Sequence, residues 1–147
     1  MILIVYENII LSGIDIGQSK EEIIDILGNP DSVRSENPID FDYRLVEDFY
    51  YGRDHFMFIA NILEKYSLWG DKLEFAYERI SIGSSISLLK ERFPSACTQA
   101  IENSNDYEYI LLGVNILKNN ELYDDAVLFY VDKKTMKVFR IEYWFPM

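Results

Sequence analysis

The chain of 147 residues has a single cysteine, Cys97, and a single histidine, His55. One cysteine cannot form an internal disulfide, which favours a reducing compartment. A zinc site needs several Cys or His ligands, and a Ser-His or Cys-His nucleophile would have to use this one histidine. We interpret His55 as part of a turn between two strands, with a structural or surface role. We therefore expect a protein that is not an enzyme and needs no metal or cofactor.

Basic residues are also scarce, because 14 Lys and Arg stand against 25 Asp and Glu, a net charge of −11. A strongly anionic surface disfavours direct binding of nucleic acid and favours a basic protein partner, although such charge can also serve solubility alone. The apolar stretch 1–13 is too short to span a bilayer and lacks the basic region and cleavage site of a signal peptide. We expect two short strands there, and a cytoplasmic protein without membrane contact.

The chain does contain two segments of similar sequence. The segment "GIDIGQSKEEIIDILGNP" at 13–30 is matched by "RISIGSSISLLKERFP" at 79–94. Each copy predicts a short strand, a glycine, a serine N-cap (Ser19, Ser85) and an apolar stripe at helical spacing, closed by a proline. Neither copy has the additional glycines and the lysine of a phosphate-binding loop. We interpret both copies as helix starts.

Strand-like sequence follows each predicted helix. The segments are 43–51, 56–63 and 72–82 in the first copy, and 107–114, 126–131 and 137–145 in the second. The order of strand, helix and three strands, repeated twice, predicts an α+β fold with an antiparallel sheet packed against helices. We expect one domain over 1–147, built from internal repeats at about 9–71 and about 75–145.

Tyrosine is abundant, with 11 residues, and it mixes with acidic residues in segments such as "IDFDYRLVEDFYYGRD". Tyrosine rings give rigid contact area and carboxylates pair with Lys or Arg, although strand aromatics are often only core residues. The predicted partner-binding residues are Asp40, Asp42, Tyr43, Glu47, Asp48 and Tyr50 in the first copy, and Glu108, Glu121, Tyr123, Asp124 and Asp125 in the second.

The repeated I-x-I-G-x-S unit followed by β-rich sequence resembles the tandem α/β unit of the β-lactamase inhibitory protein and of SmpA/OmlA-type domains. The resemblance implies a sheet whose concave face docks on another protein. A small, acidic, cysteine-poor chain also resembles bacterial immunity proteins, including those of contact-dependent growth inhibition. That resemblance implies a proteinaceous inhibitor that occludes the active site of a toxic domain, commonly a basic nuclease. The open alternatives are a small-molecule-binding or regulatory module, with a pocket between helices and sheet, and a hydrolase.

Overall fold

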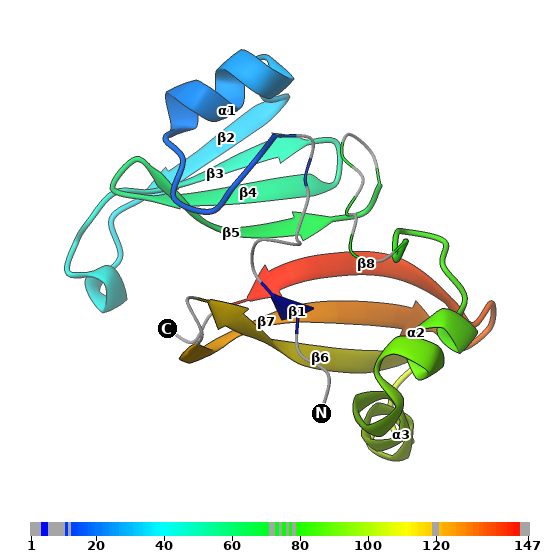
Figure 1. Ribbon diagram of the computed structural model, residues 1–147. Coiled ribbons are helices and arrows are strands. Elements are labelled where there is room, and N and C mark those ends of the chain that lie inside the picture. Colours follow the sequence, from blue (N-terminus) through cyan, green and yellow to red (C-terminus); the bar gives the residue numbers. More distant parts are fainter. Residues whose placement is uncertain are drawn as a thin grey trace.

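A computed structural model describes residues 4–5, 11, 13–70, 73, 75, 77, 79–118 and 121–144. Within these ranges, three α-helices accompany one sheet of eight strands in the order β1-β6-β7-β8-β5-β4-β3-β2 (Figure 1). All strand pairs are antiparallel except β1 with β6. The elements are β1 (Ile4–Val5), α1 (Lys20–Leu27), β2 (Ser32–Glu36), the 3-10 helix η2 (Ile39–Phe41), β3 (Val46–Tyr51), β4 (Asp54–Ile59), β5 (Ile62–Leu68), α2 (Ile86–Arg92), α3 (Pro94–Glu102), β6 (Tyr109–Lys118), β7 (Glu121–Asp132) and β8 (Lys137–Trp144).

The predicted packing of a sheet against helices is confirmed, since helices and strands share one hydrophobic core. Alternate residues of the strands point to one side of the sheet, where Phe56 and Phe58 from β4 and Phe129 from β7 are fully buried. Ile23 from α1 and Leu89 from α2 belong to the same core. The helices therefore pack on one face of the sheet. We call the opposite, helix-free side the open face.

The predicted order of strand, helix and three strands, twice over, is wrong. One helix, α1, precedes four strands, β2–β5, whereas two helices, α2 and α3, precede three strands, β6–β8. Residues 14–16 and 80–82 form turns and an isolated bridge instead of strands, and the described residues of 72–82 contribute only the bridge between Tyr77 and Ile80. Leu73, Phe75 and Tyr77 are buried, which accounts for the apolar alternation of this stretch.

Two further predicted boundaries are wrong for identifiable reasons. The segment 56–63 is divided between β4 and β5 by a tight turn, in which Ala60 and Asn61 adopt positive φ angles of 48° and 74°. Pro94 does not close the second unit. It is the first residue of α3, a position that suits proline because the first helical N–H needs no partner. Of the two strands expected in 1–13, β1 is described, and residues 6–10 lie outside the described part.

The helices α1 and α2, which begin in the two similar segments, both start at a serine N-cap, as predicted. The Ser19 hydroxyl accepts a hydrogen bond from the Glu22 N–H at 3.2 Å, and the Ser85 hydroxyl accepts one from the Ser87 N–H at 3.2 Å. Gly17 and Gly83 precede the caps with φ of 98° and 93°, a conformation that favours glycine. The motif therefore starts helices.

The same glycines join each helix start to a strand of the sheet. The Gly17 N–H donates to the Leu63 carbonyl at 2.9 Å, and the Gly83 N–H donates to the Val138 carbonyl at 2.7 Å. In return the Leu63 and Val138 N–H groups donate to the carbonyls of Gln18 and Ser84. We call the two regions the first and second junction. The hydrogen bonds make Ile62–Glu64 in β5 the counterpart of Lys137–Phe139 in β8.

Candidate functional site

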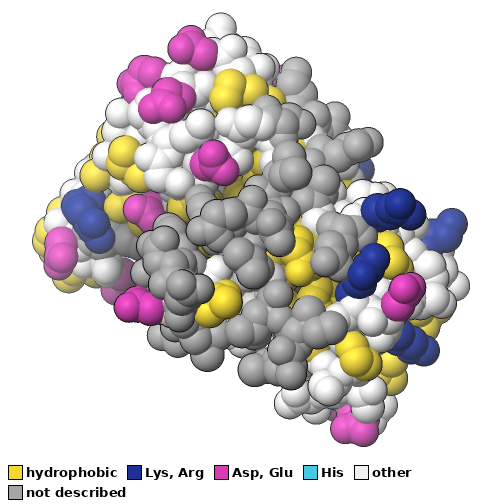
Figure 2. Space-filling view, viewed as in Figure 1, with side chains coloured by type: hydrophobic (Ala, Val, Ile, Leu, Met, Phe, Trp, Pro, Cys, Tyr) yellow, Lys and Arg dark blue, Asp and Glu magenta, His cyan; other side chains and the backbone are white. Residues whose placement is uncertain are grey.

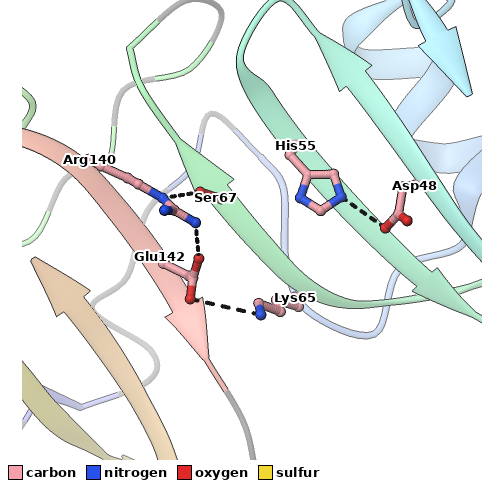
Figure 3. Close-up of polar contacts among 6 residues, drawn as sticks. All are labelled: Asp48, His55, Lys65, Ser67, Arg140 and Glu142. Carbon is pink, nitrogen blue, oxygen red and sulfur yellow. Dashed lines mark hydrogen bonds and ion pairs between the residues drawn. The ribbon is translucent and has the colours of Figure 1, made fainter. Parts of the chain in front are cut away.

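Polar and aromatic side chains cross the middle of the open face. Because successive strand residues alternate, Tyr50 and Asp48 of β3 share this face with their neighbours on β4, β5, β8 and β7. Figure 3 shows that six of these side chains follow one another across β3, β4, β5 and β8. We call the set the polar band. Its members are Asp48, Tyr50, His55, Lys65, Ser67, Trp69, Tyr130, Arg140 and Glu142.

The centre of the polar band lies where β5 pairs with β8. Glu142 is only 5% exposed, and its carboxylate contacts the Arg140 guanidinium at 2.5 Å and Lys65 Nζ at 3.8 Å. Arg140 Nε donates to the Ser67 hydroxyl at 2.7 Å. A nearly buried carboxylate requires such partners, since an unpaired charge there would be costly. These contacts tie the two halves of the sheet together across the open face.

Aromatic rings surround the same arginine. The Arg140 guanidinium carbon lies 4.7 Å from the centre of the Tyr130 ring and 5.5 Å from that of Trp69. Such cation–π contacts fix a guanidinium in one orientation. Burial raises the pKa of the Tyr130 hydroxyl, and the Glu142 charge raises it further. Tyr130 therefore stays a neutral phenol that can donate a hydrogen bond.

His55 lies at the other end of the polar band. It is the second residue of β4, after the Gly52-Arg53 turn, so the prediction that places it within the turn is wrong. Its Nε2 lies 2.8 Å from Asp48 Oδ1, and its ring stacks on Tyr50 at 4.7 Å between centres. Ser67 is its cross-strand partner, but the structure gives the Ser67 hydroxyl to Arg140. The Asp48–His55 pair orients a ring near the surface, and no nucleophile among the described residues is hydrogen-bonded to that ring.

An acidic loop borders the open face. Residues 37–45, between β2 and β3, extend away from the sheet at the left of Figure 1. Ile39 is 68% exposed and Tyr43 is 65% exposed, and they flank the exposed Asp40 and Asp42. The loop continues into Val46, which is buried against Met57 and Ile59 on the open face, apart from the main core. Exposed apolar residues among carboxylates are typical of a binding surface.

The structure brings together only part of the predicted partner-binding set. Asp40, Asp42 and Tyr43 lie in the acidic loop, and Asp48 and Tyr50 lie in the polar band beside it. Glu47 points to the helix face instead, where its carboxylate lies 2.8 Å from Lys20 Nζ. That contact ties α1 to β3.

The predicted residues of the second half do not gather in one place. Glu108 is exposed next to the β7–β8 turn, whereas Glu121 is exposed at the opposite end of β7. Asp125 accepts a hydrogen bond from the Tyr143 hydroxyl at 2.7 Å. The side chains of Tyr123 and Asp124 lie outside the described residues.

Sequence reasoning missed the centre of the polar band. Lys65, Arg140 and Glu142 stand within apolar strand sequence, "ILEKYSLW" and "KVFRIEYW". Charged residues at alternate positions of such strands indicate a half-buried polar face, and that signal was present. What the sequence lacked was the pairing of β5 with β8, which lie more than 60 residues apart.

Charge is unevenly shared between the two halves of the chain. Residues 13–70 contain 12 Asp and Glu against 5 Lys and Arg, whereas residues 79–144 contain 9 against 8. Figure 2 shows acidic side chains mainly over the side of α1, and basic side chains gathered on the side of α2 and α3.

Among the described residues, no group of three or more His, Cys, Asp or Glu side chains could hold a metal ion.

Comparisons with known proteins bear on the fold alone. No family model matches the chain, and no curated protein matches it. A similar solved structure is that of an extracellular protein containing an SCP domain from Bacillus anthracis str. Ames, with a TM-score of 0.54 and 13% identity. The match covers 87% of this chain but 43% of that protein, so the chain spans less than half of its length. Among the described residues, no helix has the length and apolar character needed to cross a membrane.

Proposed function

We propose that the protein is an inhibitor of the immunity type, which binds a basic toxic effector domain and occludes its active site. The observation that carries this proposal is the acidic loop, where Ile39 and Tyr43 are exposed beside Asp40 and Asp42 at the border of the open face. Apolar anchors ringed by charge are the usual make-up of a protein-binding surface. The protein would act in the cytoplasm as a binding partner, without catalysis and without a cofactor.

The proposed mechanism is occlusion. The carboxylates of Asp40 and Asp42 would take positions on the partner that nucleic-acid phosphates occupy, because both are anions that accept hydrogen bonds from Lys and Arg. Ile39 and Tyr43 would pack into the same groove and exclude water. Asp48, His55 and Tyr50 supply a second contact area behind the loop. The acidic charge of residues 13–70 would speed the encounter with a basic partner.

The experiment uses the basic effector domain encoded beside this protein in its native host, with binding measured by calorimetry. The double substitution Asp40→Lys and Asp42→Lys is expected to weaken binding at least about tenfold, since like charges would then meet. The double substitution Asp15→Lys and Asp25→Lys, at exposed positions outside the acidic loop, changes the net charge equally and is expected to change affinity much less. Wild-type binding should weaken strongly as salt rises, because exposed charges are screened. Equal binding by the double variant, or salt-independent binding, would contradict the proposal.

We also propose that the two junctions are copies of one unit, which diverged afterwards. The supporting observation is that their glycines, serine caps and reciprocal strand hydrogen bonds correspond. The matched variants Gly17→Ala and Gly83→Ala should each cost about 1–2 kcal/mol of stability, because both force a side chain into a positive φ. A cost at one junction alone would argue against equivalent units.

A further inference from the structure

A groove opens at the end of the sheet where β7 turns into β8. Its volume is about 490 Å³, which is the size of a small-ligand site. The apolar lining includes Trp69, Phe139 and Ile82, and the rings of Trp69 and Phe139 lie 5.7 Å apart between centres. A smaller hollow of about 200 Å³ adjoins it, sharing Phe139 and Asp132. The groove therefore has an aromatic floor that is partly open to solvent.

Cations border this floor in a chain that is otherwise acidic. Arg53 lies over the Trp69 ring, 5.2 Å from its centre, and the exposed Lys137 also lines the groove. Lys134 lines the adjoining hollow. The acids are Glu108, which lines the hollow, and Asp132, whose Oδ1 accepts a hydrogen bond from the Lys134 N–H at 2.7 Å. Asp132 thus has a role in shaping the β7–β8 turn.

The first junction shows that the fold does not require these residues. Its strand places Ile62 and Glu64 where the second junction places Lys137 and Phe139, yet its backbone hydrogen bonds are the same. A cation and an aromatic ring therefore stand in the second junction where the first has an apolar residue and an acid. This difference places positive charge and ring surface at the groove.

We propose that this groove binds a small planar aromatic anion, of the aryl phosphate or aryl carboxylate class. The ring of the ligand stacks against Trp69 and Phe139, and its anionic group pairs with Arg53 and Lys137. Charge-assisted hydrogen bonds and ring stacking together favour such a ligand over a neutral aromatic or a bare anion. This site is separate from the acidic loop and does not depend on the inhibitor function.

Phenyl phosphate is the probe, added to the full chain while ¹H–¹⁵N NMR spectra follow the Trp69 indole N–H and the backbone of Phe139. We expect saturable shifts at both positions. Benzyl alcohol, which lacks the charge, and inorganic phosphate, which lacks the ring, should each bind at least about tenfold more weakly. Lys137→Glu and Arg53→Glu should each weaken phenyl phosphate binding at least about tenfold, whereas Lys90→Glu, an exposed charge reversal on α2, should leave it unchanged.

Three outcomes would overturn the proposal. The first is the absence of saturable shifts at Trp69 with phenyl phosphate and with benzoate. The second is undiminished binding in Lys137→Glu and Arg53→Glu, or equal binding of benzyl alcohol, which would make the groove merely apolar. The third is a loss of partner binding in Lys137→Glu without any small-anion binding by the wild type, which would make the groove a protein contact. Failure of the acidic loop variants to affect partner binding would not bear on this site.

Discussion

The two junctions share their backbone hydrogen bonds but differ in the side chains around them. In the first, α1 and its four strands carry most of the negative charge of the described residues, and a projecting acidic loop extends from them. In the second, α2, α3 and three strands carry nearly balanced charge. There Lys137 and Phe139 of β8 line an aromatic groove, to which the first half also contributes Arg53 and Trp69. The shared hydrogen bonds and the buried apolar positions maintain the fold, so the surfaces of the two halves can differ without loss of the fold. We therefore propose two separate binding surfaces on one sheet, the acidic loop and the groove.

The largest expected effect tests whether the two halves fold as one. Phe58 in β4 and Phe129 in β7 are both fully buried in the same core. Phe58→Ala and Phe129→Ala should each lower the free energy of unfolding by about 3–5 kcal/mol, from lost burial and the cavity left behind. Urea unfolding, followed by circular dichroism and by tryptophan fluorescence, should show one shared transition for both variants. Two separate transitions, with only one shifted in each variant, would mean that the halves unfold independently.

A smaller effect is expected at the contact between the halves. Glu142→Ala leaves Arg140 and Lys65 without their shared carboxylate, and it should cost about 1–3 kcal/mol. The two cations are partly exposed, so water softens the loss. The matched variant Glu47→Ala removes the partner of Lys20 within the first half and should cost about 1 kcal/mol or less. Equal losses of stability for the two variants in thermal or urea unfolding would show that the contact between β5 and β8 stabilises the protein no more than the Lys20–Glu47 pair does.

A gain in stability is expected where the two halves differ in one turn residue. Asn61 and Met136 precede β5 and β8 with φ of 74° and 57°, and their carbonyls accept from Lys20 N–H and Ile86 N–H respectively. Asparagine tolerates this left-handed conformation better than methionine does. Met136→Asn should therefore stabilise the protein by about 0.5–1 kcal/mol in urea unfolding. The reverse substitution, Asn61→Met, should destabilise the protein. If Met136→Asn instead lowers the free energy of unfolding, the Met136 side chain makes a contact that stabilises the protein more than the relieved backbone strain does.

Some elements of the fold were predictable from the sequence, whereas others carry no local signal. The caps at Ser19 and Ser85 were predictable because an N-cap depends on neighbours within three residues. The strands β6, β7 and β8 were predictable in outline from apolar alternation. The five residues of β2, SVRSE, are all exposed and include one apolar side chain, Val33, so no periodicity marks them. The turn at Ala60-Asn61 lacks glycine and proline, and so β4 and β5 were merged.

The candidate site was harder to predict than the fold. The acidic loop was identified through Asp40, Asp42 and Tyr43, because local composition reveals an exposed polar segment. The polar band was not, because it depends on which strands pair. Lys65 and Arg140 become neighbours of Glu142 only when β5 lies beside β8. Pairing between strands so distant in the chain is not encoded in any short stretch of sequence.

The smallest expected effect is the pH response of a group that the second half lacks. Hydrogen bonding by the Asn61 side chain to Glu21, at 3.0 Å, lowers the pKa of the Glu21 carboxyl below its usual value of 4.5. A pKa lowered in the folded state contributes stability above pH 4.5, and that contribution is lost as the pH falls through the folded pKa. Carboxyl ¹³C NMR titration should therefore give a midpoint below 4.5 for Glu21, and Asn61→Ala should move it upward. The corresponding position on α2 is Ser87, which has no carboxyl group to titrate. If Asn61→Ala leaves the Glu21 midpoint unchanged, this hydrogen bond does not lower the Glu21 pKa. The two junctions would then not differ in this respect.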